Sequence, residues 1–524
     1  MLSLAGHPFN QDTADIALCS SDDIVFKLHK VILCLASDFF KDMLSLPQPS
    51  SVESGSSQDA NDFDGLPVVH VSEHSKVLDR IFRLCYPVDD PPLETIEEVR
   101  STLEAAMKYQ MAEAVKITKR RLLGLARDDP LRVYAVACCF SLEEEASAAA
   151  QEVLKQKAQE GYVEELEEIS IGAYHRLLSY CQRRGRVRDQ FMFTVHRSGV
   201  RGPAPSVTST PTLNAIALDT TDKALEPRVA LHPFDDPEAE ITLVTSDGVE
   251  YRVHKKILQL SSPVLYATAK GLLASDRTTI SVAEPSRIMD ILLRLCYPVL
   301  EPEVGDLHDI SVALAAAEKY NMQRASQVLR NAMASRRDST SDDPVVLYAI
   351  ACRFGMRDIA VAAARRTLHT EIMQSSVSEL DSIGVSGGCL FRLLEYQRRC
   401  KAAIRSIFNG THGWIDSDML AQLQQCCSMA NFNPLSRMPC WYDEYMSRIG
   451  EEGWPRSEMV QDELLLLSVV ESAERAQRAN YPCVTCFDRR GTFLLISFSR
   501  CVADTIDSLE RKVTLQWTVP SQAQ

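Results

Sequence analysis

Two cysteines near the end of the chain have a spacing suited to metal binding. Cys483 and Cys486 are separated by two residues, and such a pair supplies two of the four ligands in many tetrahedral zinc sites. The other side chains that would complete a site are Cys426, Cys427, Cys440 and His412. A single pair is a weak signal, because free cysteines are among the most commonly buried residues. The sequence therefore favours buried thiols, and we expect no metal and no cofactor.

Catalysis and nucleic-acid binding find little support in the sequence. It has no glycine-rich phosphate loop and no His-Glu-x-x-His motif. Residues 183–188 form a basic run, interpreted as a solvated helix end rather than a nuclear signal or a nucleic-acid contact. His29 and His254 are expected to cap or pack locally rather than bind a ligand. The net charge is −15, whereas a general nucleic-acid binder needs a basic face, so we expect a protein that is not an enzyme and binds no nucleic acid.

Composition is that of an ordinary globular protein. Hydrophobic residues make up 45% and charged residues 24% of the 524 residues, and this length favours roughly three to five domains. No apolar stretch approaches the roughly 20 residues of a membrane-spanning helix, and the start of the chain lacks a signal-peptide pattern. The 16 cysteines are therefore expected to be reduced. We expect an intracellular protein, in the cytoplasm or the nucleus, without a membrane partner.

An internal repeat organises the chain. Residues 83–88 and 294–299 both read Arg-Leu-Cys-Tyr-Pro-Val, 211 positions apart. A second motif, Ala-Ala-x-Lys-Tyr-x-Met, occurs at residues 105–111 and 316–322. Such repetition is the signature of a duplicated structural unit. The chain is therefore expected to contain two copies of one fold, and what both copies keep identifies the residues that the fold needs.

Each copy starts with the alternation expected of a two-stranded hairpin. Inward apolar positions match at an offset of 225, while the positions between them differ, as expected of a sheet with one buried face. An amphipathic helix follows, at residues 29–40 and 254–265, and then a third strand and further helices. The matched inward positions are Ile16, Leu18, Ile24, Phe26 and Leu28 in the first copy, and Ile241, Leu243, Val249, Tyr251 and Val253 in the second.

Regions between and after the copies differ in character. The offset falls from 225 to 211 across residues 47–65, a polar stretch that predicts a surface loop in the first copy. A stretch rich in Pro, Ser and Thr joins the copies as a flexible linker. We predict a first α/β body at 14–125 with a helical extension at 126–195, a linker at 196–238, a second body at 239–335 with an extension at 336–408, and an α-rich C-terminal region at 409–524.

The order of these elements resembles the BTB (POZ) domain. The resemblance rests on strand, turn, strand, then His-Lys-x-x-Leu-x-x-x-Ser, a third strand, and helices that lead to Ala-x-x-Tyr-x-Met. It covers residues 14–125 and 239–333 and looks most like the BTB proteins common in fungi that carry helical C-terminal extensions. The resemblance implies an α+β fold class, with two BTB/POZ-like domains, each followed by a helical extension, and then an α-rich tail.

The resemblance also points to charged residues at an interface. In the family, an acid on the first strand and a base at the start of the first helix line a charged pocket where two domains meet. Asp15 and Lys30 match these positions in the first copy, and Glu240 and Lys255 match them in the second. These four residues are the predicted partner-binding residues. The alternative interpretation is a partly exposed structural ion pair, which contributes little to stability.

The family consists of protein-interaction modules, so the resemblance implies a non-enzymatic scaffold. Some members homodimerise, some present substrates to cullin-based ubiquitin ligases, and some repress transcription; a cullin adaptor and a transcriptional co-regulator are therefore the alternatives. The first strand is predicted near Ala14, so the long exchanged N-terminal segment of many members is expected to be absent, which speaks against a standard swapped homodimer. We expect protein partners, with the copies paired within one chain or in a homo-oligomer, and a cullin as a further partner.

Overall fold

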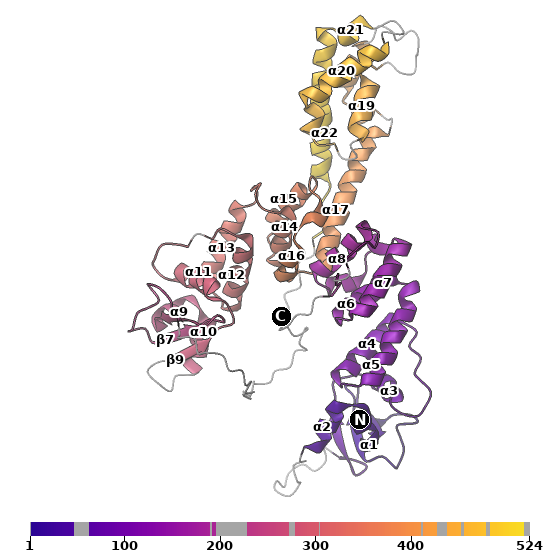
Figure 1. Cartoon of the computed structure of the whole chain (residues 1–524), viewed down its shortest axis with the longest axis vertical. Coiled ribbons are helices and arrows are strands. Elements are labelled where there is room, and N and C mark those ends of the chain that lie inside the picture. Colours follow the sequence, from indigo (N-terminus) through magenta and orange to yellow (C-terminus); the bar gives the residue numbers. More distant parts are fainter. Residues whose placement is uncertain are drawn as a thin grey trace. The chain divides into compact units, whose positions relative to one another are not determined.

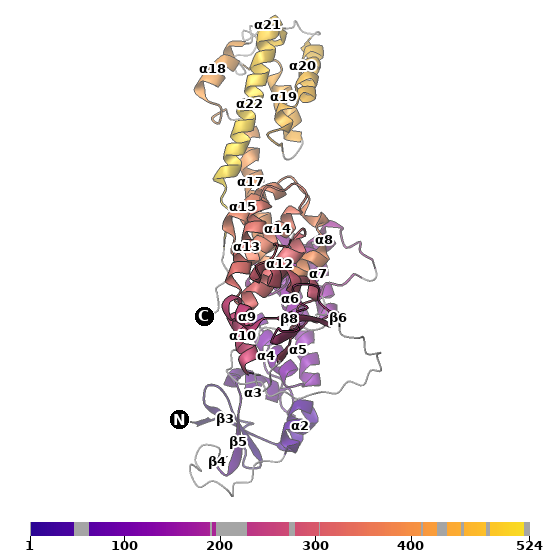
Figure 2. The ribbon, with the colours of Figure 1, turned by 90° about the vertical axis from the view of Figure 1, so that its left-hand side faces the viewer.

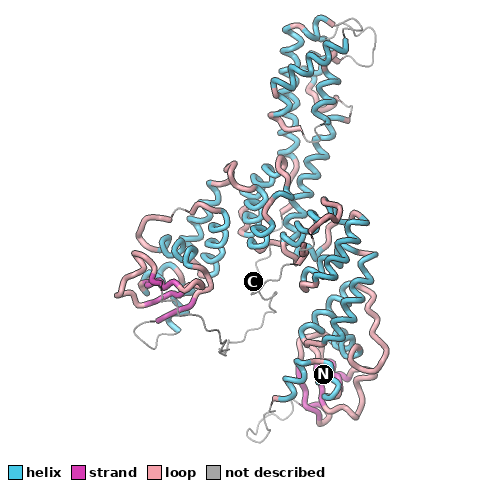
Figure 3. The backbone as a smooth tube through the Cα atoms, viewed as in Figure 1, coloured by secondary structure: helices cyan, strands magenta, loops and turns pink. Residues whose placement is uncertain are grey.

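The computed structural model describes ten stretches of the chain, which fall into two compact units, Met1–Pro203 and Ala204–Gln524. Strands occur near the start of each unit and helices make up most of the remainder (Figure 3). Within the described ranges, no helix combines the length and the apolar composition needed to cross a membrane. The described residues are 2–46, 62–188, 191–194, 228–271, 278–302, 304–409, 412–426, 438–451, 455–477 and 483–517.

The first copy is built on a five-stranded sheet of order β1-β3-β2-β5-β4; its strands β3, β4 and β5 are labelled in Figure 2. Strands β2 and β3 form the predicted antiparallel hairpin, in which Ile16 pairs with Leu28 and Leu18 with Phe26. Strand β5 runs parallel to β2, and helices cover the core that these residues face. The elements are β1 (Ser3–Leu4), β2 (Ile16–Cys19), β3 (Ile24–Leu28), α1 (Lys30–Ala36), α2 (Asp38–Ser45), β4 (Asp62–Phe63), β5 (Leu66–His70), α3 (Ser75–Arg83), α4 (Ile96–Lys108) and α5 (Ala112–Gly124).

The repeated hexapeptide joins the N-terminal arm of the first copy to its core. Nη2 of Arg83 donates to the carbonyl oxygen of His7 at 3.0 Å, and the guanidinium lies 5.8 Å from the centre of the Phe9 ring. Phe9 is fully buried and meets the ring of Tyr86 edge-on, with 5.3 Å between the ring centroids. The hydroxyl of Tyr86 accepts a 2.9 Å hydrogen bond from the amide of His29. One short motif thus holds the arm and the start of α1 together.

The second copy repeats these contacts with matched residues. Nη2 of Arg294 donates to the carbonyl oxygen of His232 at 3.3 Å, and the guanidinium lies 5.6 Å from the centre of the Phe234 ring. The ring of Tyr297 lies 5.1 Å from that of Phe234, and its hydroxyl accepts a 2.9 Å hydrogen bond from the amide of His254. Tyr297 therefore occupies the same environment in this copy as its counterpart in the first, as the repeat predicts.

The second shared motif binds a single carboxylate in each copy. The lysine ammonium and the tyrosine hydroxyl of Ala-Ala-x-Lys-Tyr-x-Met both contact a glutamate that precedes the third helix. This glutamate side chain is only 13% exposed in the first copy and 11% exposed in the second, so its charge needs the cationic partner. The two sets are Glu73 with Lys108 and Tyr109, and Glu284 with Lys319 and Tyr320.

A four-stranded sheet of order β6-β8-β7-β9 forms the second copy. In the β7–β8 hairpin Ile241 pairs with Val253 and Leu243 with Tyr251, which is the register of the first copy. The elements are β6 (Arg228–Val229), β7 (Ile241–Val244), β8 (Val249–Val253), α9 (Lys255–Ser261), α10 (Pro263–Gly271), β9 (Thr278–Ser281), α11 (Ser286–Cys296), α12 (Leu307–Lys319) and α13 (Gln323–Ser335).

The two sheets differ in how their faces are covered. In the second copy, β7 alternates between buried and half-buried residues, which confirms a sheet with one buried face. In the first copy all four residues of β2 are buried, so the prediction of a sheet with only one buried face was wrong for this copy. The reason is a second, small apolar cluster on the other face. It consists of Ala17, Cys19 and Val25, with Phe63, Leu66 and Val68 packed against them.

Helical extensions follow both copies, as predicted. Asp129 and Asp343 cap α6 and α14 through their side chains, and each helix has proline at its first position. The matched residues Tyr134 and Tyr348 are buried, and their hydroxyls donate to backbone carbonyls in α8 and α17. The helices are α6 (Pro130–Cys139), α7 (Glu143–Gln156) and α8 (Ile171–Gln182), then α14 (Pro344–Arg353), α15 (Arg357–Thr367), α16 (Val377–Ile383) and α17 (Gly387–Arg405).

The C-terminal region is α-rich, as predicted. Helix α22 lies along α17 (Figures 1 and 2), and the core of the region contains the fully buried residues Trp441, Tyr445 and Phe498. Ile404 and Ile407 belong to the same core, which therefore begins before residue 409. The helices are α18 (Ser417–Cys426), α19 (Tyr442–Glu451), α20 (Glu463–Gln477), α21 (Val484–Phe487) and α22 (Arg489–Lys512).

The beginnings of both copies differ from the prediction. Strand β1 pairs in parallel with β3, so the first copy has a strand well before Ala14. Strand β6 pairs in the same way with β8 and lies inside the predicted linker 196–238. Residues 196–227 of that linker and 47–61 of the predicted loop lie outside the described residues. Two-residue strands carry no periodicity, so alternation in the sequence does not reveal them.

Candidate functional site

The helix pair after the first hairpin exposes apolar side chains. Leu35 on α1 is 85% exposed, and Val31, one turn earlier on the same helix, is also exposed. Residues four positions apart lie on one face of a helix. Phe39 at the start of α2 is exposed as well. These three residues are called the first apolar face.

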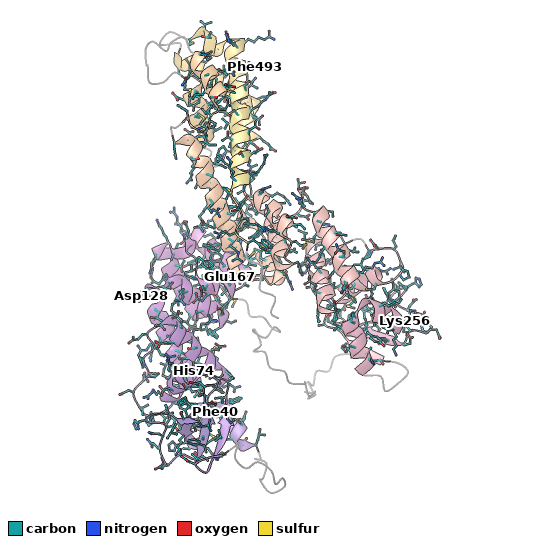
Figure 4. The ribbon with its side chains drawn as sticks, turned by 180° about the vertical axis from the view of Figure 1, so that it is seen from behind. Phe40, His74, Asp128, Glu167, Lys256 and Phe493 are labelled. Atoms are coloured by element: carbon teal, nitrogen blue, oxygen red, sulfur yellow. The ribbon has the colours of Figure 1, made fainter. Side chains whose placement is uncertain are left out.

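The helix pair of the second copy exposes apolar side chains at matched positions. Leu260 on α9 is 79% exposed and corresponds to Leu35, while the exposed Val264 on α10 corresponds to Phe39. Lys256, whose side chain is exposed on α9, stands where the first copy has a valine (Figure 4). Leu260, Val264 and Lys256 are called the second face.

The inner side of each helix pair is fixed to its core. Oγ of Ser37 accepts a 3.0 Å hydrogen bond from the amide of Phe40 and donates to the carbonyl oxygen of Tyr109. Oγ of Ser262 donates to the carbonyl oxygen of Tyr320 at 2.8 Å, in the same position of the second copy. Both serines are buried, so these anchors are shielded from water. The exposed apolar residues therefore lie on helices whose inner side is fixed to the core of the domain.

The four charged residues predicted from the resemblance lie at the start of these helices. Oδ1 of Asp15 accepts a 2.7 Å hydrogen bond from the backbone amide of Lys30, and Oε2 of Glu240 accepts a 3.0 Å bond from that of Lys255. The backbone bond from Lys255 lowers the pKa of Glu240, with a further contribution from His254. Each carboxylate thus caps a helix N-terminus, where the helix dipole favours negative charge. In both copies the bond is made by the backbone amide of the lysine and not by its ammonium group.

The two histidines at these helix starts pack locally, in different surroundings. Nε2 of His29 lies 3.0 Å from the hydroxyl oxygen of Thr13. Nε2 of His254 lies 3.3 Å from a carboxylate oxygen of Asp236, and its Nδ1 lies 3.9 Å from Glu240. One histidine therefore faces a neutral hydroxyl and the other faces two carboxylates.

Two cysteines and one serine of the described residues have surroundings that do not favour a role as nucleophile. Burial raises the pKa of Cys85 and of Cys138 to about 12, so their thiolate forms are disfavoured. Residues 384–388 fit Gly-x-Ser-x-Gly. That pattern forms a nucleophile elbow between a strand and a helix, whereas here it joins α16 to α17. The local structure therefore does not favour this serine as a nucleophile.

The remaining motifs are a basic run and the tail cysteines. Residues 183–188 follow the end of α8, and their arginines are exposed, as expected of a solvated helix end. The sulfur atoms of Cys440, Cys483 and Cys486 lie within 4.8 Å of one another. His412 is engaged elsewhere, with Nδ1 3.2 Å from a tyrosine hydroxyl. The Cys-x-x-Cys pair is evident in the sequence, but the sequence does not show that Cys440 lies next to it in the fold.

Comparison with protein-family models finds the BTB/POZ domain twice, at residues 6–124 and 235–337. Both matches start before the first hairpin; the first includes the arm residues His7, Pro8 and Phe9, and the second starts directly after the matching residue Phe234. A comparison with curated proteins finds no match. BTB domains are protein-interaction modules that mediate dimerisation and, in some families, bind cullins. The two matches and the shared contacts of the two copies identify residues 6–124 and 235–337 of this chain as two BTB/POZ domains in tandem.

Proposed function

We propose that this protein is a non-enzymatic scaffold for protein–protein interaction and that its two BTB domains pair with each other within one chain. The supporting observation is the exposure of apolar side chains at matched positions of α1–α2 and α9–α10. Adjoining exposed apolar residues on a rigid surface mark interaction sites more often than single ones do. The first apolar face and the second face are therefore the proposed contact surfaces.

The apolar residues supply enough free energy to centre an interface. Burying one leucine side chain contributes about 2 kcal/mol, so Leu35 and Leu260 are proposed as the central anchors. Phe39 and Val264 extend the apolar area around them. A specific interface also needs a polar rim. We assign that rim to the charged residues of the helix starts, Asp15, Lys30, Glu240 and Lys255.

Two considerations favour pairing of the unlike copies. An isologous contact places the same patch on both sides, so a contact of the second copy with itself would contain Lys256 twice. Like charges brought together at an interface are unfavourable, whereas a contact between unlike copies contains Lys256 once and Val31 once. In addition, a tether between two binding modules gives an effective concentration of about millimolar. Pairing within one chain is therefore expected to exceed pairing between chains.

The test of this proposal combines a mass measurement with a proximity measurement. Light scattering of the full chain is expected to give the monomer mass of 58.5 kDa. Lysine cross-linking with mass spectrometry is expected to join α1–α2 to α9–α10. Replacing both anchors, Leu35→Asp with Leu260→Asp, should abolish these cross-links and leave each domain folded, because both side chains lie outside the cores of their own domains.

A matched control separates the anchors from a general effect of charge. Gln259→Asp adds one negative charge, as Leu260→Asp does, at the exposed position beside Leu260, and it should leave the cross-links in place. An obligate homodimer whose two copies give no mutual cross-links contradicts pairing within the chain. Loss of cross-links in the control variant contradicts the assignment of the contact to the apolar anchors.

The alternatives place the same domains in a different assembly. Some BTB families bind cullins, so a pull-down of the full chain with a purified cullin tests the role of substrate adaptor. Stoichiometric capture would make the adaptor the better description, and no capture removes it. For the role of transcriptional co-regulator, affinity purification from a nuclear extract is expected to recover DNA-binding proteins, and their absence removes that role.

A further inference from the structure

Three cysteines from two separate parts of the C-terminal region lie close together in the fold. The sulfur atoms of Cys440, Cys483 and Cys486 lie within 4.8 Å of one another, although Cys440 is 46 residues from Cys486 in the sequence. In a tetrahedral site with zinc–sulfur bonds of about 2.3 Å, neighbouring sulfurs are about 3.8 Å apart. The three sulfurs therefore stand close to the arrangement that a bound metal ion requires.

A fourth cysteine lies beside these three. Cys426 is the last residue of α18, and its Sγ lies 3.8 Å from the carbonyl oxygen of Thr485. Thr485 stands between Cys483 and Cys486 in the sequence. The thiol of Cys426 also interacts directly with that of Cys486. The sulfur of Cys426 is not within 4.8 Å of all three others, so it becomes the fourth ligand if the end of α18 moves closer to them.

Hydrogen-bond donors surround the sulfurs of the Cys-x-x-Cys pair. The pair forms a tight turn, in which the amide of Cys486 donates to the carbonyl oxygen of Cys483 at 3.2 Å. The amide of Cys440 donates to Sγ of Cys486 at 3.4 Å, and Oγ1 of Thr485 lies 3.1 Å from Sγ of Cys483. Donors of this kind orient metal ligands and stabilise thiolates.

Helix α22 approaches this turn too closely for any side chain. A Cβ atom added at Gly491 would lie 2.5 Å from the carbonyl carbon of Cys486 and from the carbonyl oxygen of Thr485. The start of α22 is held there by Asp488, whose carboxylate accepts from the amides of Arg490 at 2.8 Å and Gly491 at 2.9 Å. The glycine therefore allows the helix to fix the cysteine turn in place.

Because the cysteines are buried, their thiolate forms need a nearby cation to balance the negative charge. Cys483 and Cys486 are each 1% exposed. Crowded thiolates in such a place repel one another, but a divalent cation reverses this balance, since a coordinated thiol is deprotonated outright.

We propose that Cys426, Cys440, Cys483 and Cys486 bind one zinc ion that joins the end of α18, the segment just before α19, and α21. A closed set of four thiolates suits zinc in a structural role. Binding replaces the four thiol protons with bonds to the metal and releases them to solvent, with no change in oxidation state. The ion would close one end of a core that contains Trp441 and Phe498.

The test is the metal content of the full chain purified under reducing conditions without a chelator. Elemental mass spectrometry is expected to give one zinc per chain. Cys440→Ser and Cys486→Ser should each lose most of this zinc. Cys400→Ser is the matched control, because Cys400 is fully buried in α17 outside the cluster, and this variant should keep its zinc.

A second measurement avoids variants that fail to fold. The wild-type chain, refolded or exchanged with cobalt, is expected to show a thiolate-to-cobalt charge-transfer band and the visible bands of tetrahedral cobalt. A wild-type chain that holds no metal after purification with zinc, and that gives no cobalt–thiolate spectrum, overturns the proposal. So does a disulfide among the four cysteines in protein isolated without oxidant. Iron found in place of zinc overturns the choice of metal.

Discussion

Phe9 and Phe234 hold the N-terminal arms of the two BTB domains, but with different support. Among the described aromatic rings, Phe9 contacts three and Phe234 contacts two. The missing ring is that of Phe82, where the second domain has the equally buried Leu293. The arm contacts therefore tolerate an exchange of one apolar side chain for another as long as the site stays filled.

Outward positions differ much more than inward ones. The sheet of the first domain is covered on a second face by a small apolar cluster, whereas the second domain leaves the corresponding face half-buried. On the helix pair, Val31 is matched by Lys256 while Leu35 and Leu260 keep their type. The inward set specifies the shared fold, so the outward differences are where the two domains acquire separate roles.

The largest effect on the free energy of unfolding is expected from substitutions of the arm residues Phe9 and Phe234. Phe9→Ala and Phe234→Ala each remove a fully buried ring and should lower the free energy of unfolding of their own domain by about 3–5 kcal/mol. Hydrogen exchange with mass spectrometry on the full chain reports each domain separately. Phe493→Ala, at a residue that is 68% exposed (Figure 4), is the control and should change stability by less than about 0.5 kcal/mol.

This measurement also tests whether the two domains can be compared as separate bodies. Each arm variant should accelerate exchange in its own domain and leave the other domain protected. Equal loss of protection in both domains from either variant would show that they unfold as one unit.

The next largest effect is expected at the buried glutamates. Glu73→Gln and Glu284→Gln keep the shape of the side chain but remove the charge that binds the lysine of the second shared motif. Each should cost about 1–2 kcal/mol, because the lysine ammonium is about half exposed and regains water. Urea unfolding of the full chain checks the values, and similar losses in the two domains are expected. A loss in one domain alone contradicts the equivalence of the motif.

The same carboxylate gives the second domain a dependence on high pH. Burial and the hydrogen bond to Glu284 raise the pKa of Tyr320 to about 12, from an ordinary value of 10.0. Because the folded pKa is the higher one, the contribution of the protonated hydroxyl is complete below pH 10 and is lost as the pH rises towards 12. Tyrosinate absorbance of Tyr320→Phe, subtracted from that of the wild type, should show one group titrating near pH 12. A difference that titrates near pH 10 contradicts the buried contact.

Repetition explains most of what the sequence predicted correctly. The hexapeptide and the Lys-Tyr motif located both domains, and alternation predicted the hairpin in which Ile16 pairs with Leu28. The contacts that make these motifs necessary were not accessible, because they join residues far apart. Arg83, for example, binds the carbonyl of His7, 76 residues earlier. Nothing in a local pattern records such a partner.

The candidate surfaces show the same limit. Apolar residues on both sides of the seven-residue helix α1 fit one amphipathic pattern, and the sequence does not tell which of them the core leaves exposed. Leu33 is buried whereas Leu35 is 85% exposed, a difference fixed by the position of Ser37 against its neighbours. In the tail, Cys-x-x-Cys was evident, but Cys440 joins it only through the packing of α19 against the core.

A smaller effect is expected from the caps of the third helices. Asp22 and Asp247 accept bonds from the amide and the hydroxyl of Ser75 and Ser286, at 2.8 and 2.6 Å in both domains. Asp22→Ala and Asp247→Ala should each cost about 1 kcal/mol, the usual value of a helix cap. Asp42→Ala, at an exposed position of α2, is the control. Local hydrogen exchange at the starts of α3 and α11 provides the measurement, and protection equal to that of the wild type there would show that these caps contribute nothing.

The acid dependence of these caps has a definite sign. The hydroxyl of Ser286 lowers the pKa of Asp247 to about 2, from an ordinary value of 3.8. Because the folded pKa is the lower one, the contribution is complete above pH 4 and is lost as the pH falls towards 2. The difference between the wild type and Asp247→Ala should therefore shrink over this range. A difference that stays constant down to pH 2 contradicts a charged cap.

Exchanging the outward residues that distinguish the two domains is expected to have the smallest effect on stability. The same exchange is expected to change the pairing of the domains. Val31→Lys and Lys256→Val each change an exposed side chain and should shift the free energy of unfolding by less than about 0.5 kcal/mol. Val31→Lys places two lysines in a contact between unlike copies, so cross-links between Lys41 and Lys270, which lie outside the exchange, should weaken.

The double exchange then separates charge from shape. The double variant, Val31→Lys with Lys256→Val, again has one lysine in the contact and should restore the cross-links between Lys41 and Lys270. Lys256→Val alone should allow the second domains of two chains to associate, which would raise the mass measured by light scattering. Cross-links that are insensitive to all three variants would place positions 31 and 256 outside the contact. The difference between the domains would then concern their separate partners rather than their pairing, since an exposed residue that diverges without affecting fold or assembly is free to recognise something else.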